Sequence, residues 1–182
     1  MEIMSDKATL RRQLLAARNA LSDQAVADAG AAIASHVLAW WQANPVPVLG
    51  VYWPMRKEPD IRTAYDALHR LGARLALPVV DGRDAPLRFL AWAPGDALQK
   101  DAMGVAVPMA SSAPLQPDAL LVPCLGFTAR RLRLGYGGGY YDRTLAIPPV
   151  PQTAGIAYAS AAVEFDAGPY DVALDRIITD RG

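Results

Sequence analysis

A glycine-rich segment, residues 133–142, carries the residue types best suited to phosphate chemistry. It reads Arg-Leu-Gly-Tyr-Gly-Gly-Gly-Tyr-Tyr-Asp, with four glycines within five positions. Such a cluster indicates turns that other residues resist, or a backbone that approaches a ligand closely. Consecutive amide N–H groups and the fork of Arg133 suit phosphate oxygens, and Asp142 is a hard ligand for Mg²⁺. The alternative is a flexible turn with solvated arginines, which leaves the tyrosines and the acid unexplained.

Two familiar glycine motifs are absent from this segment. No lysine follows the glycines, as an ordinary P-loop requires, and the dinucleotide pattern G-x-G-x-x-G fails in both possible registers. It would need glycine where Tyr140 or Asp142 stands. The segment therefore predicts a phosphate-binding loop of another kind.

Basic residues near the N-terminus have the spacing of one helix face. Lys7 and Arg11 are four residues apart, and Arg18 lies two turns beyond Arg11. Taken alone, this pattern favours a solvated basic face.

Acidic residues outside the loop are the next candidates. Glu58 comes just past a predicted strand, where ligands commonly bind in α/β proteins. Trp53 before it could form an apolar wall for a flat ring, or could equally belong to the core. Asp171, taken alone, is typical of a surface turn.

The elements that must position these residues alternate along the chain. Helices are predicted from Ser5 or Asp6 to about Asn19, from Ser22 to about Trp40, over 61–71 and from the glycine loop to before Pro148. Strands are predicted over 48–53, 74–80, 87–92, 119–123, 153–159 and 176–179, whereas 93–117 is expected to be mostly loop. This alternation predicts an α/β fold: a three-layer α/β/α, Rossmann-like domain around a mostly parallel or mixed sheet.

Composition limits the class of protein. The chain has 182 residues, 52% of them apolar and 20% charged, which predicts one domain over 1–182. Because the net charge is zero, we expect neither nucleic acid nor an acidic membrane as a partner. We expect the protein to be cytoplasmic, because no signal peptide or membrane-spanning run is visible. We also expect a monomer. Cys124 is expected to be buried, and neither histidine has metal-ligand spacing.

The loop also resembles the signature of the 5-formyltetrahydrofolate cyclo-ligase family. The resemblance covers most of the chain and keeps the family's order of motifs. The other matching segments are K-A-T-L-R (7–11), Y-W-P-M-R-K-E-P-D-I-R (52–62), L-L-V-P-C-L-G-F-T (120–128) and Y-D-V-A-L-D-R-I-I-T (170–179).

This resemblance implies a ligase that uses ATP and Mg²⁺ to convert 5-formyltetrahydrofolate to 5,10-methenyltetrahydrofolate, with the following site residues. ATP would be bound by Lys7, Arg11, Arg133, Leu134, Gly135, Tyr136, Gly137, Gly138, Gly139, Tyr140 and Tyr141. The folate would contact Trp53, Glu58, Tyr136 and Tyr140. Arg133, Tyr140 and Asp142 would be catalytic, and Asp142 and Asp171 would hold the metal.

The sequence also leaves rival functions open. A family relative could bind nucleotide and act on another substrate or on none. The arginines and tyrosines of 130–143 could serve a nucleic-acid-binding module, although the zero net charge argues against it. Some family members carry basic residues at the positions of Tyr136 and Gly138. Here backbone amides, Arg131, Arg133 and Arg143 would have to take over their phosphate contacts.

Overall fold

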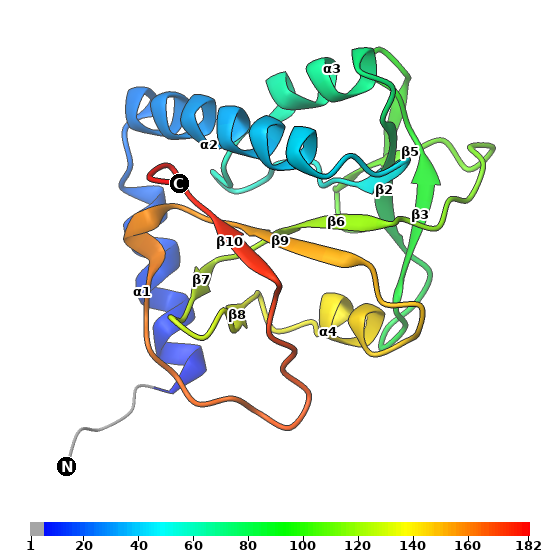
Figure 1. Cartoon of the computed structure of the whole chain (residues 1–182). Helices are drawn as coiled ribbons and strands as arrows, with labels where there is room; N and C mark the ends of the chain where they lie inside the picture. The colour runs from blue at the N-terminus through cyan, green and yellow to red at the C-terminus, as the bar shows by residue number, and fades with distance from the viewer. Residues whose placement is uncertain (1–5) are drawn as a thin grey trace.

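A six-stranded sheet forms the middle layer of the protein, with strand order β10-β9-β6-β1-β2-β3 (Figure 1). The computed structural model describes residues 6–182. All neighbouring strands are parallel except β3, which is antiparallel to β2. The bounds are β1 (Val48–Gly50), β2 (Arg74–Val80), β3 (Leu87–Ala91), β6 (Ala119–Pro123), β9 (Gln152–Ile156) and β10 (Arg176–Ile178). The predicted mostly parallel sheet is confirmed.

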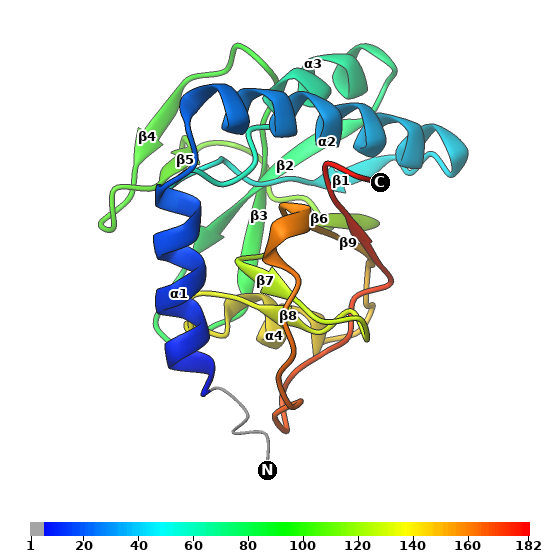
Figure 2. The same ribbon diagram turned by 90° about the vertical axis from the view of Figure 1, so that its left-hand side faces the viewer.

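Helices cover both faces of this sheet (Figures 1 and 2). On one face lie α2 (Asp23–Ala43) and α3 (Arg62–Arg70); on the other lie α4 (Tyr140–Leu145) and the small pair β7 (Gly126–Phe127) and β8 (Arg133–Leu134). The first helix, α1 (Lys7–Asn19), stands beside the sheet at the end where β9 passes into the 3₁₀ helix η1 (Ala159–Ala161). Within residues 6–182, no helix is both long and apolar enough to cross a bilayer.

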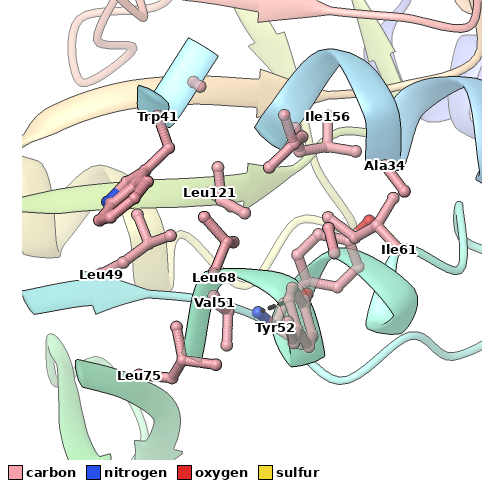
Figure 3. Close-up of a cluster of buried hydrophobic side chains, with 14 of the residues drawn as sticks. Ala34, Trp41, Leu49, Val51, Tyr52, Ile61, Leu68, Leu75, Leu121 and Ile156 are labelled. Atoms are coloured by element: carbon pink, nitrogen blue, oxygen red, sulfur yellow. Dashed lines mark hydrogen bonds between the residues drawn. The ribbon is translucent and has the colours of Figure 1, made fainter. Parts of the chain in front are cut away.

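The core consists of two layers of side chains because the parallel strands are buried on both faces. Leu49, Leu121 and Ile156 pack toward α2 and α3 (Figure 3). Their neighbour Leu120 points the other way and packs with Tyr141 of α4. Gly50 leaves room for this packing, since an added Cβ would lie 2.3 Å from Leu120 Cδ2.

The segment predicted as loop, 93–117, contains two strands that the sequence analysis missed. They form an antiparallel hairpin, β4 (Leu98–Lys100) and β5 (Ala106–Pro108). The Asp101 carboxylate closes the turn by accepting hydrogen bonds of 2.9 Å from the N–H groups of Met103 and Val105. Strands of three residues are too short to show a periodic pattern, so the sequence did not reveal them, although most of 93–117 is loop as expected.

The ends of three elements agree only in part with the positions that the sequence predicts. Ser22 caps α2, because its hydroxyl accepts a hydrogen bond from the N–H of Ala25. Asp6 precedes α1 but makes no side-chain cap, and Ser5 lies outside the described residues. The first strand is shorter than predicted and ends at Gly50, although Val51 N–H still bonds to the carbonyl of Ala76.

The end of α3 needs a residue with positive φ. Gly72 has a φ of +101°, its N–H donates to the carbonyl of His69, and the N–H of Ala73 donates to the carbonyl of Leu68. This is the Schellman arrangement, which satisfies the last carbonyls of a helix.

We therefore expect Gly72→Ala to destabilise the protein by about 1–2 kcal/mol, because a Cβ disfavours left-handed backbone. Gly82→Ala is the matched control: an added Cβ meets nothing at either position, but only Gly72 has positive φ. The control should stay within about 0.5 kcal/mol of wild type in urea unfolding. Equal losses in both variants would contradict the explanation.

Candidate active site

A cleft of about 270 Å³ opens at the carboxyl ends of β1 and β6. The chain leaves β1 toward β2 on one side, whereas β6 lies on the other side, so the strand order reverses here. Open α/β sheets commonly bind ligands at such a point. Every predicted site residue lines this cleft, namely Lys7, Arg11, Trp53, Glu58, Arg133, Leu134, Gly135, Tyr136, Gly137, Gly138, Gly139, Tyr140, Tyr141, Asp142 and Asp171.

Two cations of α1, Lys7 and Arg11, line the cleft, and a third, Arg18, lies behind its lining. Lys7 forms an ion pair with Asp171, which is 164 residues away in the sequence. Arg11 Nε donates a 2.8 Å hydrogen bond to the carbonyl of Gly135 in the glycine loop. Arg18 lies deeper and contacts Tyr136 and Cys124. The predicted basic face is therefore turned toward the cleft and bonded, rather than solvated.

The glycine loop, residues 135–139, has the backbone that its composition predicts. Gly137 and Gly139 have φ of +99° and +68°, and the loop leads directly into α4. Gly137 and Gly138 are exposed, so their amides are open to a ligand. Leu134, which precedes the loop, has a fully buried side chain, so only its backbone is available for binding.

Of the loop's arginines, only Arg133 lines the cleft. Its Nε donates to the carbonyl of Pro123, and its guanidinium lies 5.0 Å from the ring centroid of Tyr141. Arg143 is bonded on the outer side of the loop, to the carbonyls of Ala85 and Gly138. Arg131 is turned away and donates to the carbonyl of Leu174, so it supports the fold rather than the cleft.

Glu58 forms the acidic end of the cleft, and only 5% of its surface is exposed. Its Oε2 accepts from the N–H of Met55 at 3.0 Å, and its Oε1 accepts from the hydroxyl of Tyr136 at 2.9 Å. Burial raises the pKa of the Glu58 carboxyl, and these two hydrogen bonds and the charges of Arg18 and Arg133 oppose the rise. Burial also raises the pKa of Tyr136 to about 12, so its hydroxyl keeps its proton at neutral pH.

An apolar wall faces these charges. Trp53 lines the cleft and also packs edge-on against Trp92, with 5.8 Å between the ring centroids, so part of it belongs to the core and its role toward a ligand stays a prediction. The sequence analysis missed Val105 and Met103, which the β4–β5 hairpin adds to the lining. Met103 is 61% exposed, and an apolar side chain so open beside a cleft can cover a bound ring.

Asp142 and Asp171 lie close enough for their charges to interact. Burial raises the pKa of Asp142, and the charge of Asp171 adds to the rise. Burial acts on Asp171 too, but the hydrogen bonds from Lys7 and Gly168 N–H lower its pKa overall. Within residues 6–182, no group of three or more His, Cys, Asp or Glu could enclose a metal ion. The pair places two carboxylates, which are hard oxygen donors, in the lining of the cleft.

Cysteine and histidine often act in catalysis, but Cys124 and His36 have structural surroundings here. Cys124 is buried as predicted, and burial raises the pKa of its thiol to about 11, which suppresses the reactive thiolate. His36 Nδ1 lies 2.9 Å from the carbonyl oxygen of Thr179, far along the chain from the glycine loop.

A family model described as the 5-formyltetrahydrofolate cyclo-ligase family matches residues 3–180. A 5-formyltetrahydrofolate cyclo-ligase from Mycolicibacterium smegmatis is 32% identical over 140 residues, which is 71% of this chain and 72% of that protein. A protein of the same name from Escherichia coli is 26% identical over 170 residues, covering 89% of this chain and 93% of its own.

Solved structures share the fold. A 5,10-methenyltetrahydrofolate synthetase from Mycoplasma pneumoniae superposes with a TM-score of 0.82 at 27% identity, covering 97% of this chain and 99% of its own. The synthetase from Aquifex aeolicus gives a TM-score of 0.78 at 24% identity, with coverages of 97% and 90%. The predicted α/β architecture is therefore confirmed.

The raised pKa of Glu58 predicts how stability depends on pH. The folded protein binds a proton at Glu58 more tightly than the unfolded chain does, because the pKa of this carboxyl is raised on folding. The free energy of unfolding therefore falls as the pH rises from the ordinary glutamate pKa to the raised one. Glu58→Gln removes the titration. We expect wild type to gain melting temperature relative to the variant as pH is lowered through that window, measured by calorimetry at several pH values. A constant difference between the two proteins would contradict this account.

Proposed function

This chain belongs to the 5-formyltetrahydrofolate cyclo-ligase family, and we propose that it converts 5-formyltetrahydrofolate and ATP to 5,10-methenyltetrahydrofolate, ADP and phosphate. Membership confirms the predicted family and makes the protein a ligase that forms a C–N bond. One observation carries the proposal for the site. Residues from four separate segments, singled out for phosphate, metal and ring binding, line the same cleft.

The reaction follows from the chemistry of the formyl group. A formamide oxygen is a poor leaving group, so in the proposed reaction it attacks the γ-phosphorus of ATP and ADP departs. The formyl carbon is then electrophilic, and the lone pair of N10 of the same substrate attacks it. The new ring closes, phosphate leaves with the former formyl oxygen, and N10 loses its proton. No protein nucleophile is required, so the protein mainly positions its substrates and neutralises charge.

The folate is proposed to bind with its ring between the acid and the apolar wall. A carboxylate that is fixed by protein donors at both oxygens, as in Glu58, still has lone pairs for the N–H groups of a pterin. Trp53 and Met103 offer apolar surface to the flat rings. Tyr136 of the glycine loop and Tyr140 just after it also line the cleft and would contact the folate.

The nucleotide phosphates are proposed to lie on the glycine loop, facing α1. The exposed amides of Gly137 and Gly138, together with Arg133, would contact phosphate oxygens. Arg11 contacts this loop and Lys7 lies beside Asp171, both on one rigid helix that faces the cleft, so they could stabilise the charge on a transferring phosphoryl group.

Mg²⁺ fits the residues at Asp142 and Asp171. The Asp142 carboxylate accepts no hydrogen bond from residues 6–182 and faces the cleft, so it is free to bind a hard cation. When bound there, the cation would neutralise phosphate charge. Asp171 would exchange its partner Lys7 for the metal, which leaves the lysine ammonium free to meet the phosphates.

The decisive experiment mixes the protein with MgATP and 5-formyltetrahydrofolate and follows the absorbance of the methenyl product. We expect product and ADP to form in equal amounts. Nucleotide binding without any methenyl product would instead favour a family relative that acts on another substrate.

We expect Asp142→Asn to abolish most turnover while the fold stays intact, because the change removes a charge and keeps the volume. Turnover and MgATP binding should be measured across a Mg²⁺ titration, with thermal melting to check the fold. Wild-type turnover at every Mg²⁺ concentration would disprove the metal assignment.

Gly137→Val tests the loop, because a β-branched residue resists positive φ and would stand where phosphate approaches the backbone. Gly95→Val is a matched control, since Gly95 has a φ of +97°, has open space at its Cβ, and does not line the cleft. Both variants should lose stability, but only Gly137→Val should lose activity per folded molecule, by at least tenfold. Equal specific activities would show that the loop is a plain surface turn.

A further inference from the structure

A buried arginine lies behind the cleft without a carboxylate partner. Arg18 is only 4% exposed, and within the described part of the chain no acidic side chain forms an ion pair with it. Instead, its two terminal nitrogens donate to the hydroxyl of Tyr136 at 2.7 Å and to the carbonyl of Cys124 at 3.1 Å. Burying an arginine in this way is costly, so its contacts require an explanation.

The contact with Tyr136 fixes the direction of a hydrogen-bond chain. A guanidinium can only donate, so the Tyr136 oxygen must accept from Arg18. The single proton of that hydroxyl is then directed at Glu58 Oε1, 2.9 Å away. Without the arginine, the hydroxyl could rotate and leave Glu58 with only its bond from Met55.

The chain also links two parts of the cleft that differ in sequence and in proposed ligand. Tyr136 belongs to the glycine loop, whereas Glu58 follows β1 and lines the cleft together with Trp53 of the apolar wall. Arg18 sits on the same helix as Arg11, which holds the carbonyl of Gly135 next to Tyr136. One helix therefore sets both the loop backbone and the tyrosine that reaches the acid.

We propose that Arg18 is a positioning residue that acts through the Tyr136 hydroxyl to hold Glu58 ready for the N–H donors of the folate. This inference rests on the proposed function and adds a residue to it. Arg18 itself does not line the cleft, so it acts only through the tyrosine that does. Its charge near Glu58 also favours the ionised carboxylate that such donors need.

A double-mutant cycle tests this arrangement. The affinity for 5-formyltetrahydrofolate without nucleotide is measured by calorimetry for wild type, Arg18→Met, Tyr136→Phe and the double variant. We expect each single change to weaken folate binding about tenfold, the range of one lost charge-assisted hydrogen bond. The double variant should bind nearly as well as either single one, because both changes break the same chain. For Arg18→Met, a change outside the cleft lining, MgATP affinity should change by less than about threefold.

Two further variants separate positioning from folding. Arg12→Met removes an exposed arginine of the same helix, whose guanidinium donates to the hydroxyl of Thr9, and should bind folate like wild type. Arg18→Lys keeps the buried cation and should recover most of the affinity that Arg18→Met loses. Melting curves set the assay temperature, so that every variant is measured fully folded.

The outcomes are distinct. If the losses of folate affinity multiply to about a hundredfold in the double variant, or if the affinities for folate and MgATP fall equally, Arg18 only stabilises the fold. Either result would overturn this inference and leave the proposed function standing. No folate binding by wild type would overturn the proposed function and, with it, the inference.

Discussion

The docking of α1 against the glycine loop is the interaction on which the cleft depends. This helix belongs to neither layer that covers the sheet, so the sheet alone does not place it. Leu10 and Leu14 anchor it in a third apolar cluster with Leu134 and Phe165. Its cations then contact Asp171, Gly135 and Tyr136, and these contacts close one side of the cleft. Without this helix the carboxyl edge of the sheet would be open to water.

Charge is distributed unevenly in this protein although its total is zero. Lys7, Arg11 and Arg133 meet Glu58, Asp142 and Asp171 around one small cleft with an apolar wall. Such a wall excludes water and strengthens the effect of each charge on its neighbours. The raised pKa values of Glu58 and Asp142, both caused mainly by burial, reflect this environment. Shifted carboxyl groups gathered in a cleft are typical of functional sites.

The family resemblance allows basic residues at two positions of the loop, where this chain has Tyr136 and Gly138. The hydroxyl of Tyr136 instead joins the buried cation of Arg18 to the buried acid Glu58. At Gly138 no side chain replaces the other basic residue, and the ring of Tyr140 occupies the space, because an added Cβ would lie 2.8 Å from it.

Local features were readable from the sequence because they depend on neighbouring residues. Hydrophobic runs predicted β2 and β6 with their observed bounds, Ser22 predicted the start of α2, and the density of glycine predicted the backbone of the loop. The motifs also predicted the family and the residues that line the cleft. These patterns are readable in the sequence because backbone φ preferences, helix capping and the periodicity of buried residues each depend on only a few neighbouring residues.

Only the tertiary structure decided which distant groups meet. Arg130, Arg131 and Arg133 look alike in sequence, yet Arg131 bonds to Leu174 while Arg133 turns into the cleft. The spacing of Lys7, Arg11 and Arg18 predicted a shared helix face but not its partners, which lie more than a hundred residues away. The β4–β5 hairpin likewise depends on packing rather than on its own short strands. Long-range contacts follow from how the layers pack, and no local pattern of residues encodes that packing.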